Sequence, residues 1–138
     1  MRDIEVSRVV AASPPTVRRA LTPTGMVVYE GSFSVVDVAE GDADGVTHVT
    51  VGAGGLEMTL RFEEREDGLY YTQEGESGPF ASMQTRVTVE AESGGSRVTA
   101  WSNVSLGLPL PSLTDRVAGW KRRGELRRAL EALEDDVT

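Results

Sequence analysis

The chain has 138 residues, of which 39% are hydrophobic and 26% are charged. These values are typical of a globular domain and exclude wholesale disorder. No apolar run approaches the roughly 20 residues that a membrane-spanning helix needs, and the first ten residues lack the apolar core of a secretion signal. The absence of cysteine excludes disulfides and thiolate metal sites. We therefore expect one soluble, cytoplasmic domain over residues 1–138, without integral membrane association.

The formal net charge of -8 makes nucleic acid an unexpected partner, because an acidic surface repels phosphate backbones. The basic residues cluster at one place near the C-terminus, namely Lys121, Arg122, Arg123, Arg127 and Arg128. Acidic residues follow directly, so we interpret this cluster as a solvated helix face, with contact to an acidic partner as the alternative. Lys121 is the only lysine among 14 basic residues. Acidic excess with so little lysine favours a halophilic, salt-adapted surface, although codon bias alone would give the same composition.

The N-terminal segment predicts a strand followed by a short helix. Residues 4–10 mix apolar and charged positions in the manner of a strand. Ser13 offers an N-cap with Pro14 at the first helical position, so a helix is predicted from there to about Leu21. Pro23 is expected to end this helix. A second brief helical turn is predicted over residues 24–29.

From residue 32 to residue 106 the pattern predicts only strands, turns and loops. The predicted strands cover residues 32–40, 46–51, 56–62, 69–76, 80–92 and 97–106. The clearest of them is 56–62, where Leu56, Met58, Leu60 and Phe62 alternate with polar residues. Glycine-containing turns at 41–45, 52–55, 67–68 and 93–96, and a loop at 77–79, separate the strands.

The last predicted element is a long helix. Two prolines within residues 108–111 end the sheet, and the helix is predicted over residues 112–136. Apolar residues of its first half share one face: Leu113, Val117 and Trp120. Those of its second half share a nearly opposite face: Leu126, Leu130, Leu133 and Val137. Gly119 and Gly124 lie near the changeover, which predicts a bend or break there.

This order of elements predicts an α+β fold, with a seven-stranded, curved antiparallel sheet wrapped around the long C-terminal helix. It resembles the START-like (SRPBCC) superfamily, which includes polyketide cyclases and dehydrases and lipid-transfer domains. The resemblance rests on the opening strand with residues 13–17, on Gly78-Pro79-Phe80, on residues 95–99 and on the terminal leucine-rich helix. It implies a helix-grip domain that holds an apolar ligand between the sheet and the last helix.

A candidate cavity follows from the strand alternation and the helix face. Its predicted lining is Met58, Leu60, Phe62, Tyr71, Met83, Thr85, Val87, Leu113, Val117 and Trp120. The three helix residues would form the roof. Methionine and tryptophan suit an adaptable apolar pocket. The alternative is a solid core, because any sheet packed on a helix shows the same pattern.

Catalytic and metal-binding signals are weak. His48 is the only histidine, so a zinc site cannot be built, and we expect no metal and no cofactor. The weak catalytic candidates are Tyr71, which faces inward if its strand is regular, and His48, which we expect at the rim or in solvent. Arg86 is expected in solvent. Trp101 is expected on the outer face, where it could contact a second subunit, unless a bulge turns it inward.

The leading functional hypothesis is the binding, for carriage or sensing, of a hydrophobic or amphipathic small molecule such as a lipid, an isoprenoid or a polyketide-like compound. One alternative is an enzyme of the cyclase, dehydrase or hydratase kind that acts on a polyketide-like or isoprenoid substrate. Another is a dimerising or partner-binding module, a possible homodimer, that uses Trp101 and the basic helix face.

Overall fold

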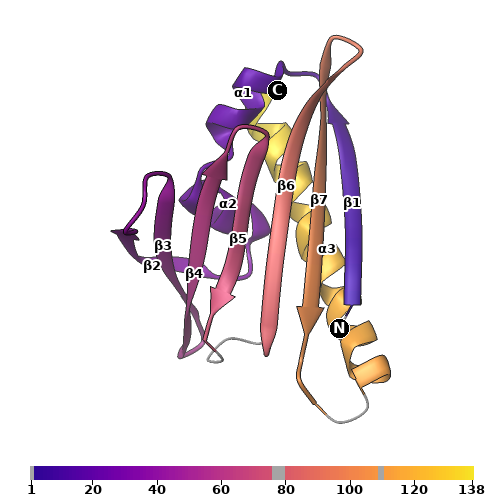
Figure 1. Ribbon diagram of the computed structural model, residues 1–138. Coiled ribbons are helices and arrows are strands. Elements are labelled where there is room, and N and C mark those ends of the chain that lie inside the picture. The colour runs from indigo at the N-terminus through magenta and orange to yellow at the C-terminus, as the bar shows by residue number, and fades with distance from the viewer. Residues whose placement is uncertain (1, 76–79, 109–110) are drawn as a thin grey trace.

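The computed structural model describes residues 2–75, 80–108 and 111–138 (Figure 1). The predicted loop at 77–79 and the prolyl segment at 109–110 lie outside these residues. The strands are β1 (Arg2–Val10), β2 (Ser34–Glu40), β3 (Val46–Ala53), β4 (Leu56–Arg65), β5 (Gly68–Glu74), β6 (Ser82–Glu92) and β7 (Gly95–Ser105). The helices are α1 (Pro14–Ala20), α2 (Pro23–Glu30) and α3 (Pro111–Val137).

Within the described residues, the strands form one seven-stranded sheet in the order β1-β7-β6-β5-β4-β3-β2. Every neighbouring pair is antiparallel. The sheet lies on one side and α3 crosses behind it, with α1 and α2 on the same side as α3 (Figure 1). This is the predicted α+β helix-grip architecture.

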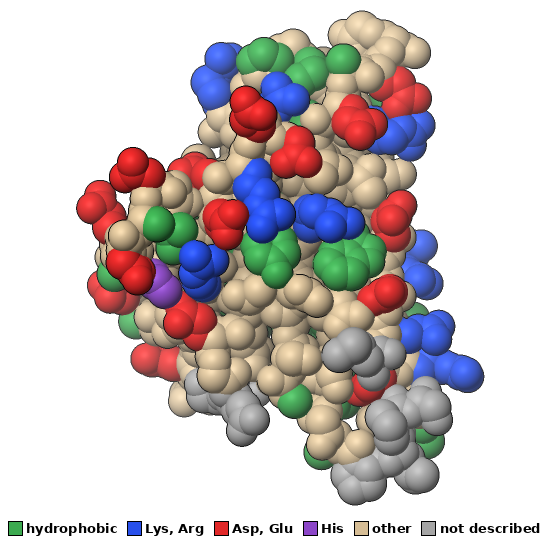
Figure 2. All heavy atoms as spheres, in the orientation of Figure 1, with side chains coloured by type: hydrophobic (Ala, Val, Ile, Leu, Met, Phe, Trp, Pro, Cys, Tyr) green, Lys and Arg blue, Asp and Glu red, His purple; other side chains and the backbone are tan. Residues whose placement is uncertain are grey.

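Side chains alternate between the two faces of the sheet as the sequence predicts. On β6 the inward residues Met83, Thr85, Val87 and Val89 are all buried. Tyr71 faces inward and is fully buried. Trp101 is half-buried on the outer face, where the guanidinium carbon of Arg86 lies 4.8 Å from its ring centroid. Figure 2 shows this outer face, on which charged side chains of both signs surround apolar ones.

The helix α2 is longer than the single brief turn expected from the sequence. Pro23 does not merely end α1, because it occupies the first turn of α2. Thr22 caps this helix: its Oγ1 accepts a hydrogen bond of 3.0 Å from the backbone N–H of Gly25. Gly31 ends the helix in the left-handed region, with φ of 75°.

The two apolar faces predicted for the last helix lie on opposite sides of it, but only the face of the second half is buried, and the face of the first half is exposed. The helix is continuous through Gly119 and Gly124, so the expected break is absent. Its buried residues form one stripe at steps of three or four: Asp115, Ala118, Gly119, Arg122, Glu125, Leu126, Ala129, Leu130 and Leu133. In the first half this stripe consists of small and charged residues. A prediction of the buried face from hydrophobicity therefore picks the opposite face of this half, which is exposed.

The two glycines of α3 have different surroundings. A Cβ on Gly119 would lie 2.6 Å from Cγ of Arg2 and 3.4 Å from Cγ2 of Ile4, so the glycine allows the helix to approach β1 closely. A Cβ on Gly124 would have no atom within 4 Å. Glycine at 119 therefore serves packing, and glycine at 124 does not.

We expect Gly124→Ala to raise the free energy of unfolding by up to about 1 kcal/mol, because alanine has the higher helix propensity and open space is available. Gly119→Ala should lower it instead, because the new methyl group forces β1 away. Urea unfolding of both variants measures the difference. An equal stabilisation by Gly119→Ala would contradict the close contact between α3 and β1.

Candidate functional site

The helices cover the inner face of the sheet unevenly, and this leaves a cavity. The helix α3 packs mainly over β1 and β7, while α2 packs against α3, β2 and β3. The space between α2, α3, β3, β4 and β6 has a volume of about 460 Å³. Its lining residues are Val27, Glu30, Ser32, Phe33, Val51, Ala53, Leu56, Met58, Leu60, Phe80, Met83, Leu106, Val117, Ala118, Lys121, Arg122 and Glu125.

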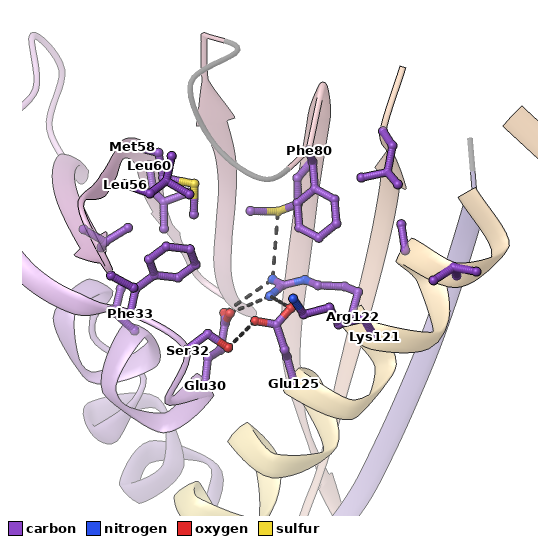
Figure 3. Close-up of a pocket in the computed structure, with 17 residues that line it drawn as sticks. Glu30, Ser32, Phe33, Leu56, Met58, Leu60, Phe80, Lys121, Arg122 and Glu125 are labelled. Carbon is purple, nitrogen blue, oxygen red and sulfur yellow. Dashed lines mark hydrogen bonds and ion pairs between the residues drawn. The ribbon is translucent and has the colours of Figure 1, made fainter. Parts of the chain in front are cut away.

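Most of this lining is apolar. The solvent exposure of individual lining residues locates the mouth of the cavity. Figure 3 shows Leu56, Met58 and Leu60 on the sheet side, across from Arg122 on α3. Among the lining residues, Leu56 is 40% exposed and Val117 is 58% exposed. Residues that line the cavity and also reach solvent mark its mouth. The mouth therefore lies between the β3–β4 turn and the N-terminal half of α3.

Arg122 reaches the floor of the cavity from α3. Its side chain is 2% exposed, and its Nη1 lies 2.5 Å from Oε1 of Glu30 at the end of α2. Its Nη2 donates at 2.9 Å to the hydroxyl of Tyr71 on β5 and at 2.9 Å to Oγ1 of Thr85 on β6. Figure 3 shows Arg122 and Glu30 pointing toward one another. One guanidinium thus joins two helices to two strands.

A second carboxylate extends this cluster. Oε1 of Glu125 lies 3.7 Å from Nη1 of Arg122, and its other oxygen accepts a hydrogen bond from the hydroxyl of Ser32. Arg128 donates at 2.7 Å to the backbone carbonyl of Glu30, at the negative end of α2. The cluster therefore fixes the C-terminus of α2 on α3.

Burial and charge act in opposite directions on Arg122. Burial lowers the pKa of Arg122, but the facing carboxylate of Glu30 more than offsets this, so its pKa is raised above the ordinary value. The guanidinium is therefore charged at every pH at which the protein folds. A buried charge of this kind is tolerated only while its partner is present.

Tyr71 keeps its proton. Burial raises the pKa of Tyr71 well above its ordinary value, and the negative charge of Glu30 raises it further. The hydroxyl donates to Glu30 and accepts from Arg122. Its ring stacks on Phe62 with centroids 4.5 Å apart. Tyr71 thus supports the floor of the cavity from beneath.

The predicted cavity residues fall into three groups. Four of them line the cavity: Met58, Leu60, Met83 and Val117. Four others are buried in the core behind it: Phe62, Tyr71, Thr85 and Val87. The two remaining residues, Leu113 and Trp120, are 60% and 75% exposed, so α3 does not use them as a roof. They project from the helix face opposite the buried stripe.

His48 lies away from the cavity, on the outer face of β3, where its Nδ1 contacts the carboxylate of Glu74. The polar residues of the cavity were not predicted as a site: Glu30, Ser32, Lys121, Arg122 and Glu125. The interpretation of Arg122 as a solvated residue was wrong. Arg122 lies four residues before the apolar Leu126, so both lie on the same face of the helix. The helical spacing therefore predicts that Arg122 is buried, although its polarity does not.

Among the described residues, no group of three or more His, Cys, Asp or Glu side chains is placed to hold a metal ion. Over the same residues, no helix combines the length and the apolar character needed to cross a membrane.

Fold and cavity together define a helix-grip domain of the ligand-binding kind. Residues 1–138 match the family described as "Polyketide cyclase / dehydrase and lipid transport", and the chain belongs to this family. No curated protein matches the chain significantly in sequence.

Solved structures show the same fold at low sequence identity. The crystal structure of TTHA0849 from Thermus thermophilus matches with a TM-score of 0.73 and 18% identity, over 99% of this chain and 97% of that one. A START superfamily protein from Mycobacterium smegmatis matches with a TM-score of 0.71 and 13% identity, over 98% and 96% of the two chains. The di-domain ARO/CYC BexL from the BE-7585A biosynthetic pathway matches with a TM-score of 0.68 and 21% identity, over 97% of this chain and 47% of that one. At these identities the likeness concerns the fold.

We expect Arg122→Met to lower the free energy of unfolding by about 3–5 kcal/mol, because Glu30 is left buried without its counter-charge. Adding Glu30→Gln to this variant should recover a large part of the loss. Urea unfolding of the four proteins in a double-mutant cycle measures the coupling. Additive single effects would show that the two residues do not depend on one another.

Stability should fall in alkaline solution in part because of Tyr71. A tyrosine in the unfolded chain ionises near pH 10, whereas folded Tyr71 keeps its proton, so the folded state binds more protons and stability decreases as pH rises above about 10. Tyr71→Phe should therefore lose less stability than the native protein between about pH 9 and pH 11. Identical losses would contradict the raised pKa of Tyr71. Burial and the neighbouring Asp136 raise the pKa of Tyr29 to about 12. Tyr29 therefore adds the same alkaline loss of stability to the native protein and to Tyr71→Phe.

Proposed function

We propose that this protein binds a hydrophobic or amphipathic small molecule in the cavity, for carriage or sensing. The observation that supports this most is the cavity itself. Its volume of about 460 Å³ falls in the range of small-molecule sites. Its walls are mostly apolar, and they meet one buried polar cluster at the floor.

The polar cluster suggests how a ligand would be oriented. An apolar body fits against Met58, Leu60 and Phe80, while a polar end would lie beside Ser32 and Glu125. Arg122 already donates hydrogen bonds to protein groups. An anionic ligand would have to compete with Glu30 for it. The arrangement therefore favours a polar end that is neutral and donates hydrogen bonds, such as a hydroxyl.

The family description supports the same class of ligand, because it joins polyketide cyclases and dehydrases with lipid transport. A lipid, an isoprenoid or a polyketide-like compound has the apolar body that the walls require. The similarity in fold to the START superfamily protein does not identify a ligand.

Filling the cavity should weaken ligand binding. We expect Leu60→Trp, and Leu56→Trp at the mouth, to weaken the binding of a long-chain fatty alcohol by at least about tenfold, because the indole occupies the ligand's space. Val38→Trp on the outer strand β2, where Val38 is 48% exposed, serves as the matched control. Native mass spectrometry and fluorescence titration measure the binding.

Equal binding by all three variants would contradict the cavity as the site. Circular dichroism identifies any variant that fails to fold. If Leu60→Trp fails to fold, Leu56→Trp still tests the cavity, because Leu56 is already partly exposed and its replacement does not disturb the core.

An enzymatic role is the second candidate, and one observation favours it. The carboxylates of Glu30 and Glu125 both line an apolar cavity, where a carboxylate can exchange a proton with a bound substrate. Such an enzyme would be of the cyclase, dehydrase or hydratase kind. Mass spectrometry of a polyketide-like compound after incubation separates the two functions: a carrier returns it unchanged, and an enzyme returns it cyclised, dehydrated or hydrated.

A further inference from the structure

The N-terminal half of α3 carries an exposed face that the cavity does not use. Its apolar members are Leu113, Val117 and Trp120, which are 60%, 58% and 75% exposed. They are spaced four and three residues apart, so they form one row along the helix. A tryptophan exposed to this degree beside two exposed aliphatic residues is unusual for a surface that faces only water.

The same face is basic. Arg116, Lys121 and Arg123 flank the apolar row, and none of them forms an ion pair or a hydrogen bond with another described residue. The acidic residue of this half of the helix, Asp115, is buried on the opposite side, and Glu125, just past this half, is buried against the cavity. In a chain whose net charge is -8, this face, which we call the α3 face, is a local concentration of unpaired positive charge.

The α3 face borders the mouth of the cavity. Val117 and Lys121 belong both to this face and to the cavity lining. In Figure 1 the first turns of α3 project beyond the N-terminal end of β1, so they are accessible to a large flat partner. Basic side chains gather along the same edge in Figure 2.

We infer that the α3 face docks on an anionic lipid surface. Its cations complement negatively charged headgroups, and each contributes to binding near such a surface. Trp120 and the aliphatic residues suit the boundary between headgroups and acyl chains, where amphipathic helices bury their apolar side. Docking in this orientation places the cavity mouth against the lipid, so that an apolar guest would not have to cross water.

Two other occupants fit the face less well. A symmetric pair formed by a second copy would bring Arg116, Lys121 and Arg123 of each chain together, and like charges would oppose it. An acidic protein would satisfy the cations, but it would not account for the position of the apolar row at the rim of an apolar cavity.

Cosedimentation with vesicles tests this inference, and it needs no ligand in the cavity. One set of vesicles contains equal parts of phosphatidylglycerol and phosphatidylcholine, and the other contains phosphatidylcholine alone. We expect binding to the anionic vesicles, little binding to the neutral ones, and weakening in high salt. In a Trp101→Phe background, the emission of Trp120 should shift to the blue on binding.

Surface variants identify the face that binds. Trp120→Ser, and the pair Arg116→Gln and Lys121→Gln, should each weaken binding by about tenfold or more. Val28→Ser, which removes another exposed apolar residue, and Arg19→Gln, which removes a charge on α1, should leave it unchanged. All these residues are exposed, so thermal unfolding should show that every variant folds.

Failure to bind the anionic vesicles would overturn the inference, and so would equal binding to the neutral ones. Binding that Trp120→Ser leaves unchanged would assign the lipid contact to another surface and overturn it too. A dimer in sedimentation that Trp120→Ser dissociates would assign the face to a second copy of the chain. Each of these results leaves the cavity hypothesis intact, because ligand binding is measured without vesicles.

Discussion

The buried ion pair between Arg122 and Glu30 is the interaction on which the rest of the structure depends. A guanidinium that is 2% exposed is stable only while its carboxylate and its hydroxyl partners stay in place. Those partners come from α2, β5 and β6. The pair therefore fixes where α3 lies over the sheet. Any shift of the helix would leave several buried polar groups without partners.

The position of α3 divides the sheet into two parts. Over β1 and β7 the helix packs closely, with Gly119 against β1 and Leu126, Leu130 and Leu133 in the apolar core. On the side of the cavity, whose other wall is formed by β3 and β4, the stripe carries Arg122 and Glu125 instead. These charged side chains cannot collapse onto Met58 and Leu60 without losing their partners. The same helix thus closes one end of the domain and keeps the other end open.

Much of the fold could be predicted from the sequence, because strand alternation is a local property. The pattern of residues 56–62 and the inward orientation of Tyr71 follow from a period of two, and the structure has both. The floor of the cavity could not be predicted in the same way. Arg122 is polar, and its burial depends on Glu30, which lies 92 residues away in the chain. Trp120 is apolar yet exposed. On α3, hydrophobicity therefore indicated the wrong face, whereas the helical period counted from Leu126 indicates the right one.

The exposed face of α3 and the cavity are separate features that meet at Val117 and Lys121. This adjacency gives the mouth of the cavity a chemical character of its own, apolar and positively charged, in a chain that is acidic as a whole. The helix therefore presents three environments around its circumference. These are an apolar core, a buried charged cluster and a basic amphipathic surface.

The central claim is that an apolar guest occupies the space between the charged stretch of α3 and the strand β4. Methyl nuclear magnetic resonance of methionine-labelled protein tests it most directly, because Met58 and Met83 line the cavity, whereas Met26 is buried in the core outside it. On titration with a long-chain fatty alcohol, the account predicts that the methyl signals of Met58 and Met83 shift while that of Met26 stays in place. Signals that remain unchanged, or an equal shift of Met26, would contradict it.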